Sequence, residues 1–272
     1  MTDETDVETM RAKVRAVYDA HSPTFLEYAG STFQSGLLRV GPEGTEDPRA
    51  HNLELARRAG LRDGDHLLDC GCGVGGPALD TASAFPDVRV DAVTISPVQV
   101  DLANGLAAER GLADRVTFTV ADYHELPFPD ASFDLVWFLE SAEYSWDQKA
   151  LFAEAFRVLK PGGRLFQKGL FRRDGDITGA PLAHLRELEE VWGVTAGLPS
   201  PSETWGAIGG AGFVIRHAGL LDGEVGQDRY VGAMVEVGPG GVPTLNPFGE
   251  VVFVPHGDIP LCYAECRAEK PL

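Results

Sequence analysis

The chain has 272 residues, of which 44% are hydrophobic and 24% charged, as expected for a globular protein that buries a full core. Its net charge of −18 disfavours nucleic acids and anionic membrane surfaces as partners. The sequence contains no apolar run near the roughly 18 residues of a membrane span, and its first residues are acidic, unlike a signal peptide. We therefore expect a cytoplasmic protein that acts on a small molecule, with no nucleic-acid or membrane partner; assembly into a homo-oligomer stays open.

Four cysteines occur in two closely spaced pairs, Cys70 with Cys72 and Cys262 with Cys266. Neither pair has the Cys-x-x-Cys spacing of the commoner zinc sites. The first pair also lies in a glycine-rich turn, where the small size of cysteine explains it. We expect four free thiols and no metal site.

The first predicted helix covers residues 7–18, where apolar side chains recur at helical spacing behind an acidic beginning. An aromatic run that contains Phe25, Tyr28 and Phe33 follows it. Residues 41–48 are rich in Gly and Pro and predict a loop.

From residue 49 onward, helix and strand patterns alternate. The predicted helices are 49–60, 77–85, 97–110 and 147–159, and the predicted strands are 66–70, 88–94, 115–120, 133–138 and 163–170. Such alternation indicates right-handed crossovers and a parallel sheet with helices on both faces. The fold class is therefore α/β, a doubly wound, Rossmann-like sheet.

The last hundred residues follow a different pattern. We predict helices at 181–192 and from 202, strands at 212–216 and 261–265, and short β-like runs at 230–237 and 250–254. Residues 222–260 carry no chemical motif. We divide the chain into an N-terminal helical segment (1–48), a cofactor-binding core (49–172) and an inserted cap with terminal strands (173–272).

The turn after the first strand is the most informative segment. Asp69 ends that strand, and closely spaced glycines lead into the next helix. Glycine allows bare backbone to approach a cofactor, and a helix N-terminus offers unpaired N–H groups. Gly71, Gly73 and Gly76 fit the pattern of a dinucleotide site, whereas Gly71, Gly73 and Gly75 fit that of an S-adenosylmethionine (SAM) site. The turn by itself leaves both cofactors open.

The remaining motifs favour SAM. In order, they are LLDCGCGVGGPAL (67–79), VTISPVQ (93–99), ADYHELPF (121–128), FDLVWFLES (133–141) and VLKPGGRL (158–165). This series resembles class I SAM-dependent methyltransferases over roughly residues 50–172. Within that class it is most similar to sterol and prenyl-diphosphate C-methyltransferases, which share GCGVGGPA and a Glu-Ser or Glu-Ala pair after the fourth strand. Residues 18–23 and the aromatic run after them are similar to the N-terminal entry segment of sterol and tocopherol methyltransferases, which forms a lid. A lid is therefore the role expected here, unless the helix only covers the sheet.

The resemblance implies a role for each of these positions. Gly71, Gly73 and Gly75 would pass under the methionine part of SAM, Asp69 would accept from its ammonium, Thr94 and Gln99 would contact the ribose, and Asp122, with Tyr123 beside it, would bind the adenine amino group. NAD enzymes usually carry an acid about 20 residues after the glycine turn. Thr94 stands near that place, which argues against NAD.

Glu140 is the candidate catalytic residue because it directly follows the fourth strand and matches the acid of the C-methyltransferases. An alkene carbon that takes a methyl group becomes a carbocation, so a carboxylate must remove a proton and aromatic rings stabilise the charge. His21 and His124 are alternative bases. The expected acceptor-binding residues are the aromatic side chains near this edge: Tyr18, Phe25, Tyr28, Tyr144 and Trp192.

The sequence thus predicts SAM-dependent methylation of a small, largely apolar metabolite, with carbon of an isoprenoid or related natural product as the acceptor. Methylation of oxygen or nitrogen in an aromatic or polyketide-like compound is the alternative. A cyclase that keeps the fold, or a SAM-binding protein without catalysis, is a third interpretation. A diphosphate on the acceptor would need basic residues or Mg²⁺. Lys168, Arg172 and Arg173 form the one local basic cluster, so a diphosphate stays open.

Overall fold

The structure, a computed structural model, describes residues 4–225, 235–237, 243–245 and 260–272. The helices are α1 (Glu4–Ala29), α2 (Pro48–Ala59), α3 (Gly76–Ala84), α4 (Pro97–Glu109), α5 (Gln148–Val158), α6 (Ala180–Trp192) and α7 (Pro201–Gly210), with short 3₁₀ turns η1 (Pro42–Gly44) and η2 (Ala142–Tyr144). The strands are β1 (His66–Cys70), β2 (Arg89–Thr94), β3 (Val116–Val120), β4 (Phe133–Leu139), β5 (Leu159–Arg172), β6 (Val214–Leu220), β7 (Val235–Val237), β8 (Pro243–Leu245) and β9 (Leu261–Glu269).

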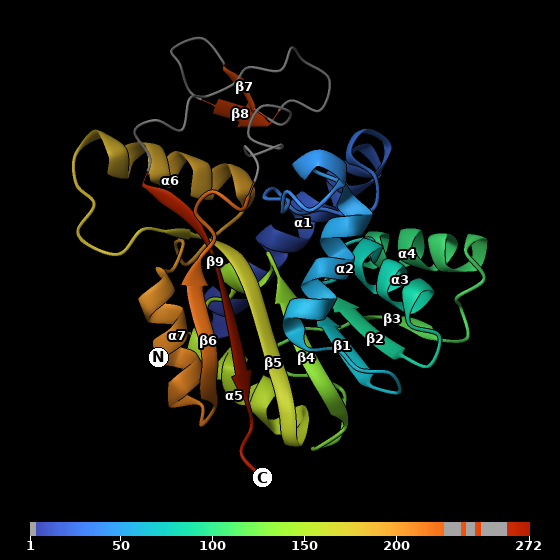
Figure 1. Cartoon of the computed structure of the whole chain (residues 1–272). Helices are drawn as coiled ribbons and strands as arrows, with labels where there is room; N and C mark the ends of the chain where they lie inside the picture. Colours follow the sequence, from blue (N-terminus) through green and yellow to red (C-terminus); the bar gives the residue numbers. More distant parts are fainter. Residues whose placement is uncertain (1–3, 226–234, 238–242, 246–259) are drawn as a thin grey trace.

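Seven strands form one sheet in the order β3-β2-β1-β4-β5-β9-β6 (Figure 1). The first five run parallel, as predicted from the alternation of helices and strands. Strand β9, outside the alternating part of the chain, is antiparallel to both β5 and β6, so the whole sheet is mixed. The doubly wound, Rossmann-like architecture itself is confirmed.

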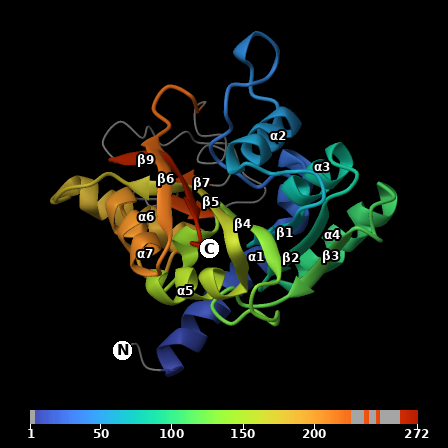
Figure 2. The ribbon, with the colours of Figure 1, turned by 60° about the horizontal axis from the view of Figure 1, so that its bottom comes forward.

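Helices cover both faces of the sheet because its strands are apolar on both sides. One cluster joins α2, α3 and α4 to side chains such as Leu67, Leu135 and Trp137, and the other joins α5 and α7 to neighbours of opposite orientation such as Leu68 and Phe138. Figure 2 shows the two sets of helices on either side of the strands. The central strands β1 and β4 are therefore held rigidly, and so are the loops that follow them.

Helix α1 is longer than predicted, since it runs from residue 4 to 29 and contains Pro23. Its first turns project beyond the sheet in Figure 2. Pro23 lacks an N–H, which normally ends a helix. The neighbouring Ser22 is fully buried and accepts a hydrogen bond from the Gln99 side chain (3.0 Å), so tertiary contacts support this part of the helix.

The C-terminal part agrees with the predictions where it is described. Helix α6 matches 181–192, and β9 extends the predicted strand 261–265 to Glu269. Of the β-like run 230–237, only residues 235–237 are described, as β7, which pairs with β8; the run 250–254 lies outside the described residues. All four cysteines are buried and free, as expected. Among the described residues, no helix is long and apolar enough to span a membrane.

Candidate active site

The candidate site lies where the strand order reverses, between the carboxyl ends of β1 and β4, as is usual in open α/β sheets. The Ser141 hydroxyl donates to the carbonyl of Cys70 (2.6 Å) and thus joins the two strand ends directly. A Cβ on Gly71, whose φ is +78°, would collide with the Ser141 side chain. Glycine is required here for this crossing as well as for access to a cofactor.

Asp69 points into the resulting pocket and is 1% exposed. Its Oδ2 is fully buried and has no hydrogen-bond partner among the described residues. Burial raises the pKa of Asp69 to about 7, opposed in part by the nearby Trp137 indole N–H. A buried, unpaired carboxylate oxygen is costly, so this site suits a cationic or N–H-donating group of a ligand.

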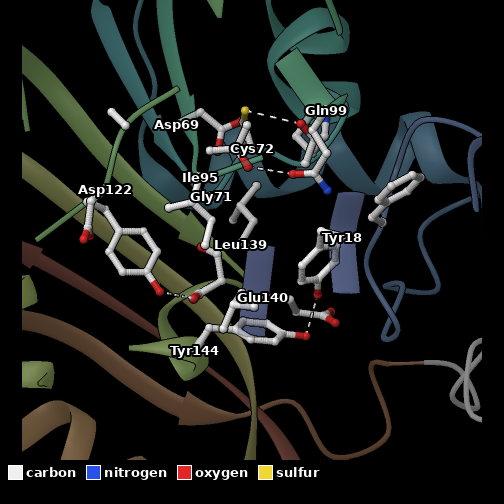
Figure 3. Close-up of a pocket in the computed structure, with 18 of the residues that line it drawn as sticks. Tyr18, Asp69, Gly71, Cys72, Ile95, Gln99, Asp122, Leu139, Glu140 and Tyr144 are labelled. Atoms are coloured by element: carbon white, nitrogen blue, oxygen red, sulfur yellow. Dashed lines mark hydrogen bonds between the residues drawn. The ribbon is translucent and has the colours of Figure 1, made fainter. Parts of the chain in front are cut away.

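Thr94 ends β2, the strand next to β1, and lines the same pocket with Gln99 of α4, which Figure 3 shows near Cys72. The Thr94 hydroxyl donates to Gln99 Oε1 (2.6 Å), while the Gln99 amide donates to Ser22 of α1. The hydroxyl of Ser96 donates to Asp19 of α1 (2.5 Å). Helix α1 is therefore hydrogen-bonded directly to the segment expected to bind ribose.

Asp122 follows β3 and is held from two sides. Its Oδ1 accepts from the backbone N–H of His124 (2.9 Å) and pairs with Nδ1 of His124 (2.8 Å), while its Oδ2 accepts from Arg11 of α1 (2.6 and 2.9 Å). Burial opposes ionisation, but the His124 hydrogen bonds and the charge of Arg11 lower the pKa of Asp122. The His124 ring stacks on Trp146 with centroids 3.8 Å apart. Four acceptor positions of this carboxylate are thus in use.

The pocket brings together most of the predicted cofactor residues. Its lining includes Asp69, Gly71, Gly73, Thr94, Gln99, Asp122, Tyr123, Glu140, Tyr18 and Tyr144. The hydroxyls of Tyr18 and Tyr144 hydrogen-bond to each other (2.6 Å), so these rings point toward one another in Figure 3. Burial, then the proximity of Tyr18 and Glu143, raises the pKa of Tyr144.

Three predicted acceptor residues do not line this pocket. Phe25 packs edge-on against Phe33, Tyr28 is 73% exposed, and Trp192 packs in a small cluster with Leu185. Because α1 continues to residue 29, Tyr28 is carried away from the sheet edge. Gly75, although expected beneath the cofactor, lies outside the lining and under Phe118, with a φ of +84° that requires glycine.

Glu140, like Asp122, accepts four polar contacts. Its Oε2 accepts from the backbone N–H (2.7 Å) and hydroxyl (2.6 Å) of Ser35, and its Oε1 accepts from the N–H of Gly36 (3.2 Å) and from Lys168 Nζ. Lys168 is fully buried and also donates to the carbonyl of Gly36 (2.5 Å). The backbone of Glu140 has a φ of +51°, a conformation that few non-glycine residues adopt and that these contacts hold.

Glu143, to which the sequence analysis assigns no role, is a second buried carboxyl next to Glu140. Its Oε2 is buried without a hydrogen-bond partner among the described residues. Burial, then repulsion by Glu140, raises the pKa of Glu143 to about 8. Neither the Lys168 contact nor the burial of Glu143 has a sequence signal, because both arise from segments that meet only in the fold.

Comparison with known protein families identifies the domain that carries this site. Residues 67–163, which carry β1 to the first part of β5, match the family described as "Methyltransferase domain". This chain contains a class I SAM-dependent methyltransferase domain. The cofactor of such a domain is SAM, so the earlier prediction of class and cofactor is confirmed.

Curated relatives match part of the chain. A 27-O-demethylrifamycin SV methyltransferase of Amycolatopsis mediterranei is 51% identical over 41% of this chain and 40% of its own length. The sterol 24-C-methyltransferase erg6 of Aspergillus fumigatus is 32% identical over 59% and 44%, and the tocopherol O-methyltransferase of Arabidopsis thaliana is 33% identical over 59% and 50%. The chain thus spans at most half the length of these relatives.

Solved structures match nearly the whole chain. The [4+2]-cyclase SpnF is 26% identical with a TM-score of 0.74, and 95% of each chain is covered. The geranyl diphosphate C-methyltransferase of Streptomyces coelicolor A3(2) is 19% identical with a TM-score of 0.72, covering 96% of this chain and 98% of its own. At that identity the second likeness shows the fold alone.

The residues present fit SAM. The unpartnered Oδ2 of Asp69 offers an acceptor to an ammonium group, and the pocket wall at Gly71 and Gly73 is bare backbone. A Cβ on Gly73 would narrow the gap to Phe33, whose ring would lie 3.6 Å away. The pocket thus combines a buried acceptor with an open wall beside it.

Proposed function

We propose that this protein transfers the methyl group of SAM to a small, largely apolar metabolite. The observation that carries this proposal is the unpartnered Asp69 oxygen beside the Gly71–Gly73 wall at the sheet's switch point. Asp69 would hold the ammonium of the cofactor, Thr94 and Gln99 its ribose, and Asp122 with Tyr123 its adenine. Bound SAM supplies the activated methyl group, so the protein's task is to bind, align and exclude water.

Helix α1 is placed where it can keep water out of the pocket. It lies over the pocket through contacts to Ser96, Gln99, Asp122 and Tyr144, all near the carboxyl ends of strands β2 to β4. A helix tied by polar side chains can release and close again, as lids over reacting groups do. We infer that α1 is the lid of the site and opens to admit SAM.

Carbon methylation of an isoprenoid-like acceptor remains our proposal for the reaction. Glu140 would remove the proton from the methylated carbon, and the paired rings of Tyr18 and Tyr144 would face the developing positive charge. The sterol C-methyltransferase relatives support this reaction. Release of Glu140 Oε2 from Ser35 would be needed before it takes a proton.

Oxygen methylation of a polyketide-like acceptor is the second candidate, and two observations favour it. A relative at 51% identity is named for the methylation of demethylrifamycin. Glu140 also accepts three hydrogen bonds from Ser35 and Gly36 and pairs with Lys168, so both of its oxygens are already occupied and neither is free to take a proton. In this reaction Glu140 would hold residues 35–36 and β5 in place, and the acceptor hydroxyl would lose its proton to water.

Methyl transfer from SAM labelled with ¹³C in the methyl group separates these reactions. A panel of prenyl alcohols, sterols, tocopherols and 27-O-demethylrifamycin SV is incubated with the protein, and the product methyl is located by NMR. A new methyl on carbon supports the first reaction, and one on oxygen the second. Binding of SAM without transfer to any acceptor, joined with ring closure of a polyene, would instead support a cyclase.

Glu140→Gln tests the proposed proton acceptor on whichever substrate is found. Loss of a general base costs about 10²–10⁴-fold in rate, so carbon methylation should slow by that factor while S-adenosylhomocysteine still binds. An unchanged rate would leave Glu140 as a positioning residue and favour methyl transfer by proximity alone.

A further inference from the structure

The charges around the pocket restrict the acceptor. Three carboxyl groups line it, those of Asp69, Asp122 and Glu140, and its lining among the described residues includes no Lys, Arg or His side chain. The nearby cations Arg11 and Lys168 are already paired with Asp122 and Glu140. The described part of the pocket therefore offers no unpaired cation to an anionic acceptor.

The basic cluster after β5 does not change this balance. Lys168 pairs with Glu140, Arg172 with Glu203 (2.7 Å) and Arg173 with Asp222 (3.1 Å). Each cation is matched by a carboxylate, so none is available to balance a diphosphate. The described residues also contain no group of three or more His, Cys, Asp and Glu side chains arranged to hold a metal ion.

A second cavity adjoins the first at Trp146, which lines both. It measures about 650 Å³ and lies between residues 175–178, α6 and residues 196–199. Small-molecule pockets usually measure about 300–1,000 Å³. The second cavity thus has room for the body of an acceptor beside the cofactor pocket.

The walls of the second cavity combine apolar side chains with two ion pairs and one further carboxylate. Leu182, Leu185 and Ile177 provide apolar surface, while Arg186 pairs with Glu189 (2.7 Å) and Arg172 with Glu203. Such ion pairs offer hydrogen bonds to hydroxyl and carbonyl groups, and Asp176, which also lines the cavity, adds a negative charge that disfavours an anionic ligand. The cavity is therefore suited to a neutral body with a mixture of hydrocarbon and oxygen functions.

We propose that the acceptor is an uncharged, oxygenated molecule whose body lies in this second cavity while its reactive end passes Trp146 to reach the methyl group. This inference rests on the proposed methyl transfer and narrows its substrate class. It separates this protein from enzymes that anchor an acceptor through a diphosphate.

The first test compares probes of different charge on the protein loaded with S-adenosylhomocysteine. Geraniol and geranyl diphosphate share a hydrocarbon chain and differ in charge, and erythronolide B is a neutral, hydroxylated macrolactone. By calorimetry, we expect both uncharged probes to bind, and geraniol to bind at least tenfold more tightly than the diphosphate. Equal or tighter binding of the diphosphate, or no binding of either uncharged probe, would overturn the proposal.

The variant Glu203→Gln sharpens this test. It removes the charge that faces Arg172, while glutamine retains the reciprocal capping bonds of α7 with Ser200. Freed from its partner, Arg172 should raise the affinity for geranyl diphosphate about fivefold and leave geraniol within twofold. No gain would show that Arg172 does not face the acceptor.

A second pair of variants locates the body of the acceptor. Leu182→Trp adds volume to the cavity wall, whereas Ala183→Trp alters the exposed neighbour on the same helix, which does not line the cavity. Leu182→Trp should weaken erythronolide B at least tenfold and spare geraniol, and Ala183→Trp should affect neither. Equal effects of the two variants would overturn this placement.

Failure of the inference and of the proposed function give different results. If S-adenosylhomocysteine itself does not bind, the proposed function is wrong. If it binds and the diphosphate is preferred, only the assignment of an uncharged acceptor fails.

Discussion

The cofactor side and the acceptor side of this site are built in different ways. On the cofactor side, Asp69 and the glycine turn are consecutive in the chain, and Asp69 Oδ2 is left without a partner. On the acceptor side, Glu140 is held by Ser35, Gly36 and Lys168, which come from distant segments. The cofactor side thus offers a free acceptor to a ligand. The acceptor side depends on contacts between distant segments that form only when the chain folds.

The largest expected effect is a loss of stability when Lys168 on the acceptor side is replaced. Lys168→Met leaves the buried Glu140 carboxylate without its counter-charge, and loss of one partner of a buried pair costs about 3–5 kcal/mol of unfolding free energy. Chemical denaturation measures this loss of unfolding free energy. The matched control is Lys160→Met on the same strand, because the Lys160–Asp134 pair is partly exposed and should contribute about 0–1 kcal/mol. Similar losses of unfolding free energy in both variants would contradict a stabilising role of the buried Lys168–Glu140 pair.

A smaller, pH-dependent effect is expected at Glu143. Its folded pKa of about 8 exceeds the value near 4.3 of an unfolded glutamate. Between these values the folded protein binds more protons than the unfolded chain, so this group lowers stability as pH rises.

Glu143→Gln should therefore become more stable relative to the parent between pH 5 and 8, by at most about 1.4 kcal/mol per pH unit. Thermal unfolding across this range measures the difference, and Glu125→Gln, at an exposed position, is the control. A difference that stays constant with pH would show that Glu143 titrates normally.

The smallest expected effect concerns the lid. Arg11 occupies both acceptor positions of Asp122 Oδ2, which the adenine amino group would otherwise use. Arg11→Ala should bind S-adenosylhomocysteine about two- to fivefold more tightly and speed amide exchange in α1, since a hydrogen bond to a charged group contributes about 1.5–3 kcal/mol and part of this is recovered from solvent. Lys13→Ala on the same helix is the control. Weaker binding by Arg11→Ala would mean that Arg11 closes the lid over the cofactor.

The sequence predicts the cofactor side well because its features are local. A strand, an acid and a glycine turn follow each other directly, and helix and strand periodicity places them at one sheet edge. Lys168 shows why the other side could not be predicted. In sequence it belongs to a basic cluster with Arg172 and Arg173, but in the fold it is fully buried against Glu140.

The direction of β9 and the length of α1 were also beyond local patterns. Strand β9 fits the predicted run, yet periodicity within one strand does not say whether it pairs parallel or antiparallel with β5 and β6. Proline disfavours a helix interior, and contacts made only in the fold, such as that of buried Ser22 with Gln99, support α1 around Pro23.

A calorimetric titration of Asp69→Asn and Glu140→Gln with S-adenosylhomocysteine tests the division between the two sides most directly. Asp69→Asn removes the charged partner of the ammonium and should weaken binding about 10–100-fold, because such a hydrogen bond contributes about 1.5–3 kcal/mol. Glu140→Gln should bind within about twofold of the parent protein. Unchanged affinity in Asp69→Asn, or an equal loss in both variants, would contradict the account.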